Sequence, residues 1–125
     1  MLRLPVLLLA ICAAGPVVAQ DWNLRGSDAI LDAAAMARIA DGGSLRFYDD
    51  GLSRFSAGGA YSYTYANDGG TAFGRFRVEA EGIICIDYRN GMSRCDKYVR
   101  NDGRLVLLTT NGERFPVKEE TGVRP

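Results

Sequence analysis

The chain of 125 residues contains no histidine. Histidine is the usual general base near neutral pH, the usual activator of a serine or cysteine nucleophile, and the commonest zinc ligand. Its absence excludes serine–histidine and cysteine–histidine hydrolases, in which the imidazole takes the proton of the nucleophile. The absence of histidine does not exclude catalysis by carboxylates alone, as in glycosidases. We therefore expect a protein that binds rather than one that catalyses, with no cofactor and no metal site.

Neither sign of charge is in excess, because 15 Lys+Arg balance 15 Asp+Glu. This balance gives no electrostatic reason to expect binding to nucleic acid or to an anionic membrane. Long apolar runs are also scarce. The one candidate lies near the N-terminus and has about 11 residues before Gly15 and Pro16, against the roughly 20 that span a bilayer. We expect no membrane span once this segment is removed.

The N-terminal segment has the three parts of a secretory signal peptide. Arg3 supplies a positive charge, an apolar core follows, and Val17-Val18-Ala19 provides small residues for cleavage. We therefore expect residues 1–19 to be a signal peptide and the mature protein to be periplasmic or secreted. A lipid anchor on Cys12 is the alternative, but a bulky residue before this cysteine and apolar residues after it disfavour that interpretation.

Cysteine is scarce as well, with three in the chain. Loss of Cys12 leaves Cys85 and Cys95 in an oxidising compartment, where a disulfide is expected. The register of the hairpin between them decides whether they meet. A two-residue Asn90-Gly91 loop leaves them offset, whereas a three-residue Arg89-Asn90-Gly91 loop, with Gly91 left-handed, places them directly opposite. We favour the three-residue loop.

Residues 29–40 are rich in good helix formers, and Ser27 is suited to cap their N-terminal end. Gly42-Gly43 marks the end of this segment. We expect one helix of about three turns that packs on a sheet. The face that we expect to be buried comprises Ile30, Ala33, Ala34 and Ala37, with Leu31 beside it.

After Gly43, short β-type runs alternate with Asn-Gly and Asp-Gly turns, which are strong hairpin signals. They predict a mainly β (α+β) fold, in which one N-terminal helix precedes an antiparallel meander of about eight strands forming a small barrel or sandwich. Pro116 fits only an edge or terminal strand. We expect a single β-rich domain at residues 20–117 and a flexible tail at residues 118–125. The expected core residues are Leu45, Phe47, Phe76, Val78, Ile84, Ile86, Leu105 and Leu107.

Some of these elements occur in a recognisable order. They are Gly74-x-Phe76-x-Val78, Gly82-Ile83-Ile84-Cys85, an Asn-Gly hairpin, Cys95 and Val99. This order resembles a family of small exported bacterial β-rich proteins of unknown function, which have a Gly-x-aromatic-x-Val strand and a cysteine pair on adjacent strands. The chain departs from that pattern at Phe76, where tryptophan is usual, and at Asp96, where an aromatic is common. The resemblance implies an envelope location and a lipocalin-like or sandwich-like shape, and it implies no activity.

Three tyrosines, Tyr61, Tyr63 and Tyr65, alternate along one run and so project from one face of a strand. They form a candidate ligand platform that would stack on sugars or on a flat ligand. The alternative is that they pack in the core or at its edge, with their hydroxyls reaching the rim of the barrel. The sequence leaves both interpretations open.

The charged residues give weaker signals. Asp49-Asp50 and Asn67-Asp68 adjoin glycines in turns, where local backbone preferences explain them better than calcium binding does. Asp87 is the best candidate for a buried carboxylate, although alternation with Ile84 and Ile86 places it on the opposite face of the sheet from these two residues.

The residues that alternate outward on one strand are Arg75, Arg77, Glu79 and Glu81. A locally basic set, a candidate surface for an anion or partner, comprises Arg89, Arg94, Lys97, Arg100 and Arg104.

Two functions follow from these observations. The first is a non-enzymatic binding or inhibitory module of the cell envelope, with an unknown protein or small ligand as its partner. The alternative is a carboxylate-based hydrolase acting on envelope glycans. The hydrolase would need two carboxylates about 5–9.5 Å apart in a cleft, one of them with a raised pKa.

Overall fold

The computed structural model describes residue 5 and residues 20–123. The predicted signal peptide, residues 1–19, thus lies outside the described residues except for Pro5. The strands of the described part are β1 (Ala29–Ile30), β2 (Ser44–Phe47), β3 (Leu52–Phe55), β4 (Ala60–Thr64), β5 (Thr71–Val78), β6 (Ile84–Tyr88), β7 (Ser93–Asn101), β8 (Arg104–Leu108) and β9 (Arg114–Thr121). The helical elements are α1 (Ala33–Ile39) and the short 3-10 helix η1 (Ala80–Gly82).

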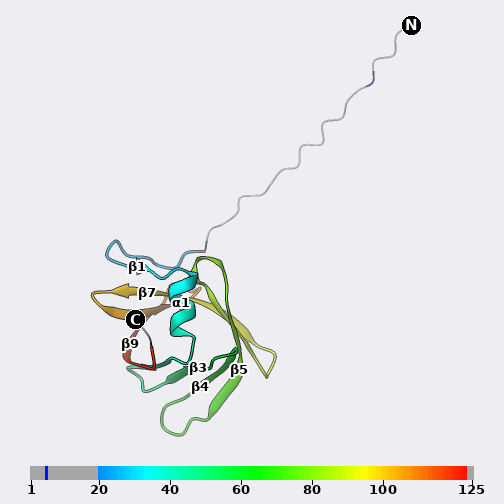
Figure 1. Cartoon of the computed structure of the whole chain (residues 1–125), viewed down its shortest axis with the longest axis vertical. Helices are drawn as coiled ribbons and strands as arrows, with labels where there is room; N and C mark the ends of the chain where they lie inside the picture. The colour runs from blue at the N-terminus through cyan, green and yellow to red at the C-terminus, as the bar shows by residue number, and fades with distance from the viewer. Residues whose placement is uncertain (1–4, 6–19, 124–125) are drawn as a thin grey trace.

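Eight of the strands in residues 20–123, β2 to β9, close into an antiparallel barrel, and β1 adds to its outside (Figure 1). Each strand pairs with the next along the chain, and β9 returns to pair with β2. The predicted fold of one helix followed by an eight-stranded meander is confirmed, and it forms a barrel. Closure removes the sheet edges that would otherwise expose unpaired backbone groups.

The last strand, β9, completes the barrel by changing partners. Pro116 pairs with Val106 of β8, and Val117 pairs with Phe47 of β2. Pro116 therefore lies on the terminal strand, as expected, at the point where β9 moves from β8 to β2. A residue without a backbone N–H is tolerated at such a change of partner because the ladder is interrupted there.

The expected tail at residues 118–125 does not begin where we predicted. Residues 118–121 belong to β9, where Glu119 pairs with Arg46 and Thr121 with Ser44. The prediction of a flexible tail is therefore wrong for these residues. Their polar side chains do not show the alternation that predicts a strand. Their backbone nevertheless supplies the hydrogen-bond partner that β2 needs for closure of the barrel.

The helix starts later than the composition predicted. Residues 29–30 form β1 against β7, and Asp32 caps α1 by accepting a hydrogen bond from the backbone N–H of Ala35 at 2.8 Å. The expected Ser27 cap is therefore wrong. The expected apolar face is also wrong, because Ile30 lies outside the helix and Ala33, Ala34 and Ala37 are exposed, whereas Leu31, which we expected beside that face, is buried. Met36 and Ile39 face the core instead. Longer side chains bury more apolar surface than the alanines that we selected.

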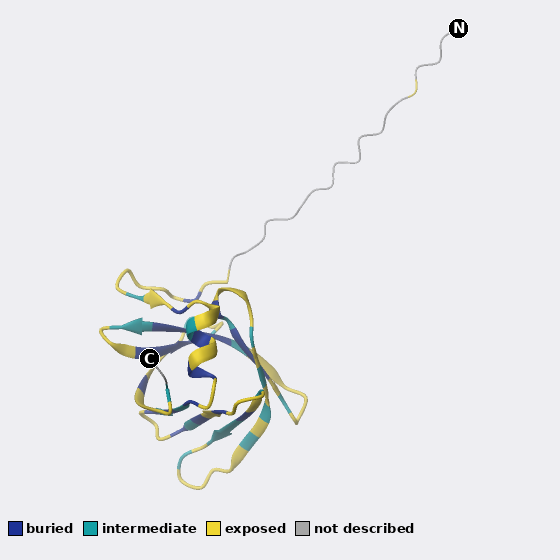
Figure 2. Cartoon of the chain, in the orientation of Figure 1, coloured by how far each residue is buried: buried dark blue, intermediate teal, exposed yellow. Residues whose placement is uncertain are grey.

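All eight predicted core residues belong to one cluster inside the barrel, although Phe76 and Val78 are only partly buried. Met36 and Ile39 of α1 join this cluster, and α1 packs against η1. The helix thus covers the end of the barrel where β5 leads into β6 (Figure 1). Figure 2 shows α1 exposed along its outer side and buried where it meets the barrel.

A second, smaller cluster lies under the residues that precede β1. Trp22 packs on Val99, Val106 and Leu108, which are buried. These three side chains come from β7 and β8 and alternate with residues of the main cluster, so they point outward. The N-terminal residues 20–28 therefore cover one part of the outer wall.

The cysteine hairpin has the register that we favoured. Cys85 pairs directly with Cys95 across β6 and β7, their Cα atoms are 4.0 Å apart, and they form a disulfide. Gly91 has a φ of 86°, as a three-residue loop requires. The bond is consistent with a non-cytoplasmic protein.

The described residues include no helix that is both long enough and apolar enough to span a bilayer.

Candidate functional site

A cavity of about 450 Å³ occupies the end of the barrel opposite α1. Its walls come from the inner faces of β2, β3, β4, β6, β7 and β8, from the turn after β2 and from the start of β9. Its size falls within the range of small-molecule sites in proteins. We call it the tyrosine cavity. Its lining consists of aromatic, apolar and a few polar side chains: Phe47, Tyr48, Asp49, Ser53, Tyr61, Tyr63, Tyr65, Tyr88, Arg94, Asp96, Tyr98, Leu107, Phe115 and Pro116.

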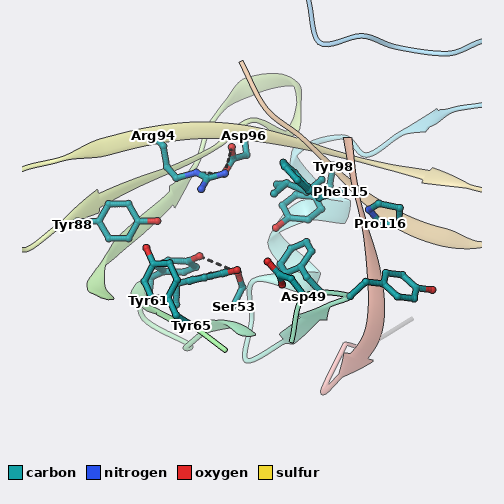
Figure 3. Close-up of a pocket in the computed structure, with 14 residues that line it drawn as sticks. Asp49, Ser53, Tyr61, Tyr65, Tyr88, Arg94, Asp96, Tyr98, Phe115 and Pro116 are labelled. Atoms are coloured by element: carbon teal, nitrogen blue, oxygen red, sulfur yellow. Dashed lines mark hydrogen bonds and ion pairs between the residues drawn. The ribbon is translucent and has the colours of Figure 1, made fainter. Parts of the chain in front are cut away.

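All six tyrosines of the chain line this one cavity. They reach it from separate parts of the sequence: three from β4 and the residue after it, and one each from the β2–β3 turn, β6 and β7. Figure 3 shows Tyr61, Tyr65 and Tyr88 on one side of the cavity, with Phe115 and Pro116 across from them. A tyrosine offers an apolar ring face and a hydroxyl that forms hydrogen bonds, which suits a wall that contacts a bound molecule.

The predicted platform of Tyr61, Tyr63 and Tyr65 spans the depth of the cavity. Tyr61 is buried, Tyr63 is partly buried, and Tyr65 is 54% exposed. The hydroxyl of Tyr61 lies 3.0 Å from that of Ser53, and the rings of Tyr63 and Tyr65 meet edge to face at 4.9 Å. Tyr61, at the inner end of the row, therefore packs in the core, whereas Tyr65, at the outer end, faces the opening of the cavity.

Gly74 allows two of the rings to meet. It pairs with Tyr61 on one side and with Tyr88 on the other, and these rings lie edge to face at 6.1 Å. A Cβ atom at Gly74 would collide with the backbone carbonyl of Asp87 on the adjacent strand. Glycine is therefore required between the two tyrosines, and its lack of a side chain leaves the inner wall to their rings.

An arginine–aspartate pair is built into the wall. Arg94 Nε donates to Asp96 Oδ2 and Arg94 Nη2 donates to Asp96 Oδ1, each at 2.9 Å. The Asp96 side chain is 6% exposed, whereas that of Arg94 is 42% exposed toward the opening. Burial raises the pKa of Asp96, and the contact with Arg94 opposes that rise. The positive charge of Arg94 and the negative charge of Asp96 thus cancel each other within the cavity.

Burial also raises the pKa of the tyrosine hydroxyls. The pKa of Tyr61 and that of Tyr98 lie well above the ordinary value, and those of Tyr63 and Tyr88 are raised by the same cause. These phenols therefore stay protonated across the physiological pH range and can both donate and accept hydrogen bonds.

Of the charged residues predicted from the sequence as candidates for binding or catalysis, Asp49 and Arg94 line the tyrosine cavity and the others do not. Asp87 is on the outer face, as alternation predicted, and pairs with Arg77 at 2.6 Å. Asp50, Asn67 and Asp68 have positive φ in turns, which is the local backbone role that we favoured.

The locally basic set does not form one surface. Arg94 lines the cavity and Lys97 is buried. Arg100 pairs with Glu120, Arg104 donates to the carbonyl of Val117, and Arg89 lies over the ring of Phe73. Strand alternation separates residues that are close together in the sequence.

Sequence reasoning missed Asp96 as the buried carboxylate. The signal was present in the register that we favoured, because placing Cys85 opposite Cys95 also places Asp96 opposite Ile84 and Arg94 opposite Ile86. Since Ile84 and Ile86 were expected in the core, their partners share the inner face. Nothing in the pattern pointed to Tyr48, which reaches the cavity from a turn.

Searches of family models, of curated proteins and of solved structures yield no match to this chain. The geometry of the cavity is therefore the basis for any functional conclusion.

Proposed function

We propose that this chain is an exported, periplasmic or secreted protein that binds a small molecule in the tyrosine cavity and acts by binding, without catalysis. One observation carries the proposal: all six tyrosines converge on one cavity at the open end of a closed barrel, whose β6–β7 hairpin is bridged by a disulfide. A core alone has no need of six phenols, because aliphatic side chains fill a barrel without hydroxyls to satisfy. Apolar walls with a few placed polar groups are typical of ligand sites.

The rim supports the same function. Tyr48, Tyr65 and Phe115 are 56%, 54% and 43% exposed, and all three line the cavity. Large apolar side chains around an opening favour the entry of a molecule with apolar surface. The disulfide and the closed sheet keep the walls in place, which lowers the entropy cost of binding.

A fluorescence titration with N-phenyl-1-naphthylamine, an uncharged aromatic probe, tests this function. Tyr65→Ala should weaken binding of the probe by about tenfold, because an aromatic contact contributes roughly 1.5 kcal/mol. Phe73→Ala is the matched control, since Phe73 is 49% exposed on the neighbouring strand and does not line the cavity. Absence of binding to the wild type, or equal weakening by both variants, would contradict the proposal.

A glycan hydrolase is the alternative, and the structure gives it one supporting observation. Asp96 is a buried carboxylate with a raised pKa, and Asp49 lines the same cavity. Both oxygens of Asp96 accept hydrogen bonds from Arg94, however, and this pairing disfavours a role as general acid. Glycan turnover that disappears in Asp96→Asn would establish the hydrolase; absence of turnover in the wild type would remove it.

A further inference from the structure

The charges that line the tyrosine cavity restrict what it can accept. Three charged side chains reach it: Arg94, Asp96 and Asp49. Arg94 and Asp96 neutralise each other's charge through two hydrogen bonds. Asp49 is an exposed residue at the rim, and its Oδ1 accepts a hydrogen bond from the backbone N–H of Gly51 at 2.8 Å. An anionic group inside would therefore meet no uncompensated cation and would lose its hydration.

The walls favour a flat molecule. Tyr61, Tyr65 and Tyr88 stand on one side, and Phe115 and Pro116 stand across the cavity from them (Figure 3). The tyrosine rings meet one another edge to face, at 71° for Tyr61 with Tyr88. A planar aromatic ring can stack against such walls with either face, whereas a branched or strongly hydrated molecule gains less from them.

Polar groups are placed to reach the edge of such a ring. Asp96 occupies Nε and Nη2 of Arg94, and the structure shows no hydrogen bond from Nη1 to a residue in the described range. A guanidinium has five N–H donors, so Nη1 keeps both of its own for an acceptor in the cavity. The hydroxyls of Tyr63 and Tyr88, which also line the cavity and stay protonated, supply further donors.

From these three features we infer that the ligand is an uncharged, planar aromatic molecule with oxygen acceptors at its edge, of the phenol or quinone class. This inference rests on the proposed function, since it names the ligand class of the same cavity. It makes the Arg94–Asp96 pair a specificity device: Asp96 cancels the charge that would otherwise attract anions, while Arg94 retains donors for a neutral acceptor.

Two probes that differ by one group test the inference. N-phenyl-1-naphthylamine is uncharged, and 8-anilino-1-naphthalenesulfonate has the same ring system with an added sulfonate. The wild type should bind the uncharged probe at least about tenfold more tightly, because the sulfonate would be desolvated without a counter-charge. Phenols and quinones should displace the bound probe. Equal or tighter binding of the sulfonate, or displacement by neutral sugars but not by phenols, would overturn the inference.

A substitution then tests the role of the pair. Asp96→Asn should raise the affinity for the sulfonate by about tenfold and leave that for the uncharged probe nearly unchanged, because Arg94 is then uncompensated. Asp87→Asn is the matched control, since it removes the same charge from an Arg–Asp pair on the outer face. An unchanged affinity ratio in Asp96→Asn would contradict the assigned role of the pair.

The outcomes separate the two proposals. If neither probe binds the wild type, the proposed function fails. If both bind but the sulfonate binds as well as the uncharged probe, the ligand class alone is wrong. The wild-type ratio decides the ligand class even if Asp96→Asn does not fold, and a double variant, Arg94→Gln with Asp96→Asn, should retain the preference for the uncharged probe.

Discussion

The carboxylate of Asp28 links the N-terminal residues to two strands of the barrel. It accepts hydrogen bonds from both Nη atoms of Arg114 on β9, at 2.7 and 2.8 Å, and from Asn101 on β7 at 2.8 Å. The backbone N–H of Arg25 adds a fourth contact at 2.7 Å. The side chains of Asp28 and Arg114 are only 1% and 10% exposed. Such an enclosed, fully paired group costs stability when one partner is removed.

Asp28→Asn should lower the free energy of unfolding at neutral pH by about 2 kcal/mol, because hydrogen bonds to a charged group are lost. The Arg114 guanidinium holds the pKa of Asp28 well below its usual value of 3.8, against the opposing effect of burial. Since the folded-state pKa is the lower one, this stabilisation is present above about pH 4 and is lost as the pH falls further. Denaturant unfolding between pH 7 and pH 2 should show a shallower acid dependence in the variant.

The exposed pair of Asp87 with Arg77 provides the control for that measurement. Their side chains are 61% and 52% exposed, so solvent screens their interaction. Asp87→Asn should leave both the stability at neutral pH and the acid dependence close to those of the wild type. A comparable loss in the two variants would show that the enclosure of Asp28 does not stabilise the fold.

At the scale of elements, the β6–β7 hairpin joins the disulfide to the cavity. Cys95 stands between Arg94 and Asp96 on β7, so the disulfide lies on one face of the hairpin and the ion pair on the other. A slip of one residue would exchange the two faces. The disulfide therefore reinforces the register, set by the three-residue turn, that directs Arg94 and Asp96 into the barrel.

Replacing Cys85 and Cys95 together by alanine should lower the free energy of unfolding by roughly 2–3 kcal/mol and leave the fold intact, because the unfolded chain regains the entropy of an open loop. Thermal unfolding followed by circular dichroism measures this change. Labelling of the unfolded, unreduced wild type should find no thiol at either position. Stoichiometric labelling of either cysteine would contradict the disulfide.

Local signals predicted most of the fold. Alternating residues and Asn-Gly or Asp-Gly turns specify hairpins within about ten residues of sequence, so the eight strands of the barrel could be predicted. The errors lie where distant contacts decide. Residues 118–121 are a strand because β2 requires a partner, and Ile30 is in β1 because β7 pairs with it. The amino-acid composition of these two segments does not indicate either strand pairing.

The candidate site was predictable only in part. The row of Tyr61, Tyr63 and Tyr65 followed from alternation on one strand. The Arg94–Asp96 pair was missed, although extending the favoured hairpin register by one step on each side of the cysteines would have placed both residues on the inner face. The contributions of Tyr48 and Phe115 depend on how a turn and the start of β9 reach the rim, and no local pattern encodes that arrangement.

At the scale of the whole molecule, export remains a prediction from residues 1–19, which lie outside the described range except for Pro5. We expect the mature protein to begin at Gln20 or within two residues of it. Intact-mass measurement of protein recovered from the cell envelope tests this. A mass that retains Met1, or that includes lipid on Cys12, would contradict the prediction.

The barrel has two different ends. One is covered by α1, with Met36 and Ile39 in the core, and the other opens through a rim of aromatic residues. Because every tyrosine lines the cavity and Trp22 packs on the outer wall, the aromatic residues themselves report where a molecule binds.

Fluorine NMR on protein labelled with 3-fluorotyrosine and 5-fluorotryptophan therefore tests the central claim most directly. The six tyrosine signals report on the cavity, and the signal of Trp22, the single tryptophan, reports on the outside of the barrel. Addition of N-phenyl-1-naphthylamine should shift several tyrosine signals together and leave the Trp22 signal in place. A saturating probe that moves the Trp22 signal, or that moves none of the tyrosine signals, would contradict binding in the tyrosine cavity.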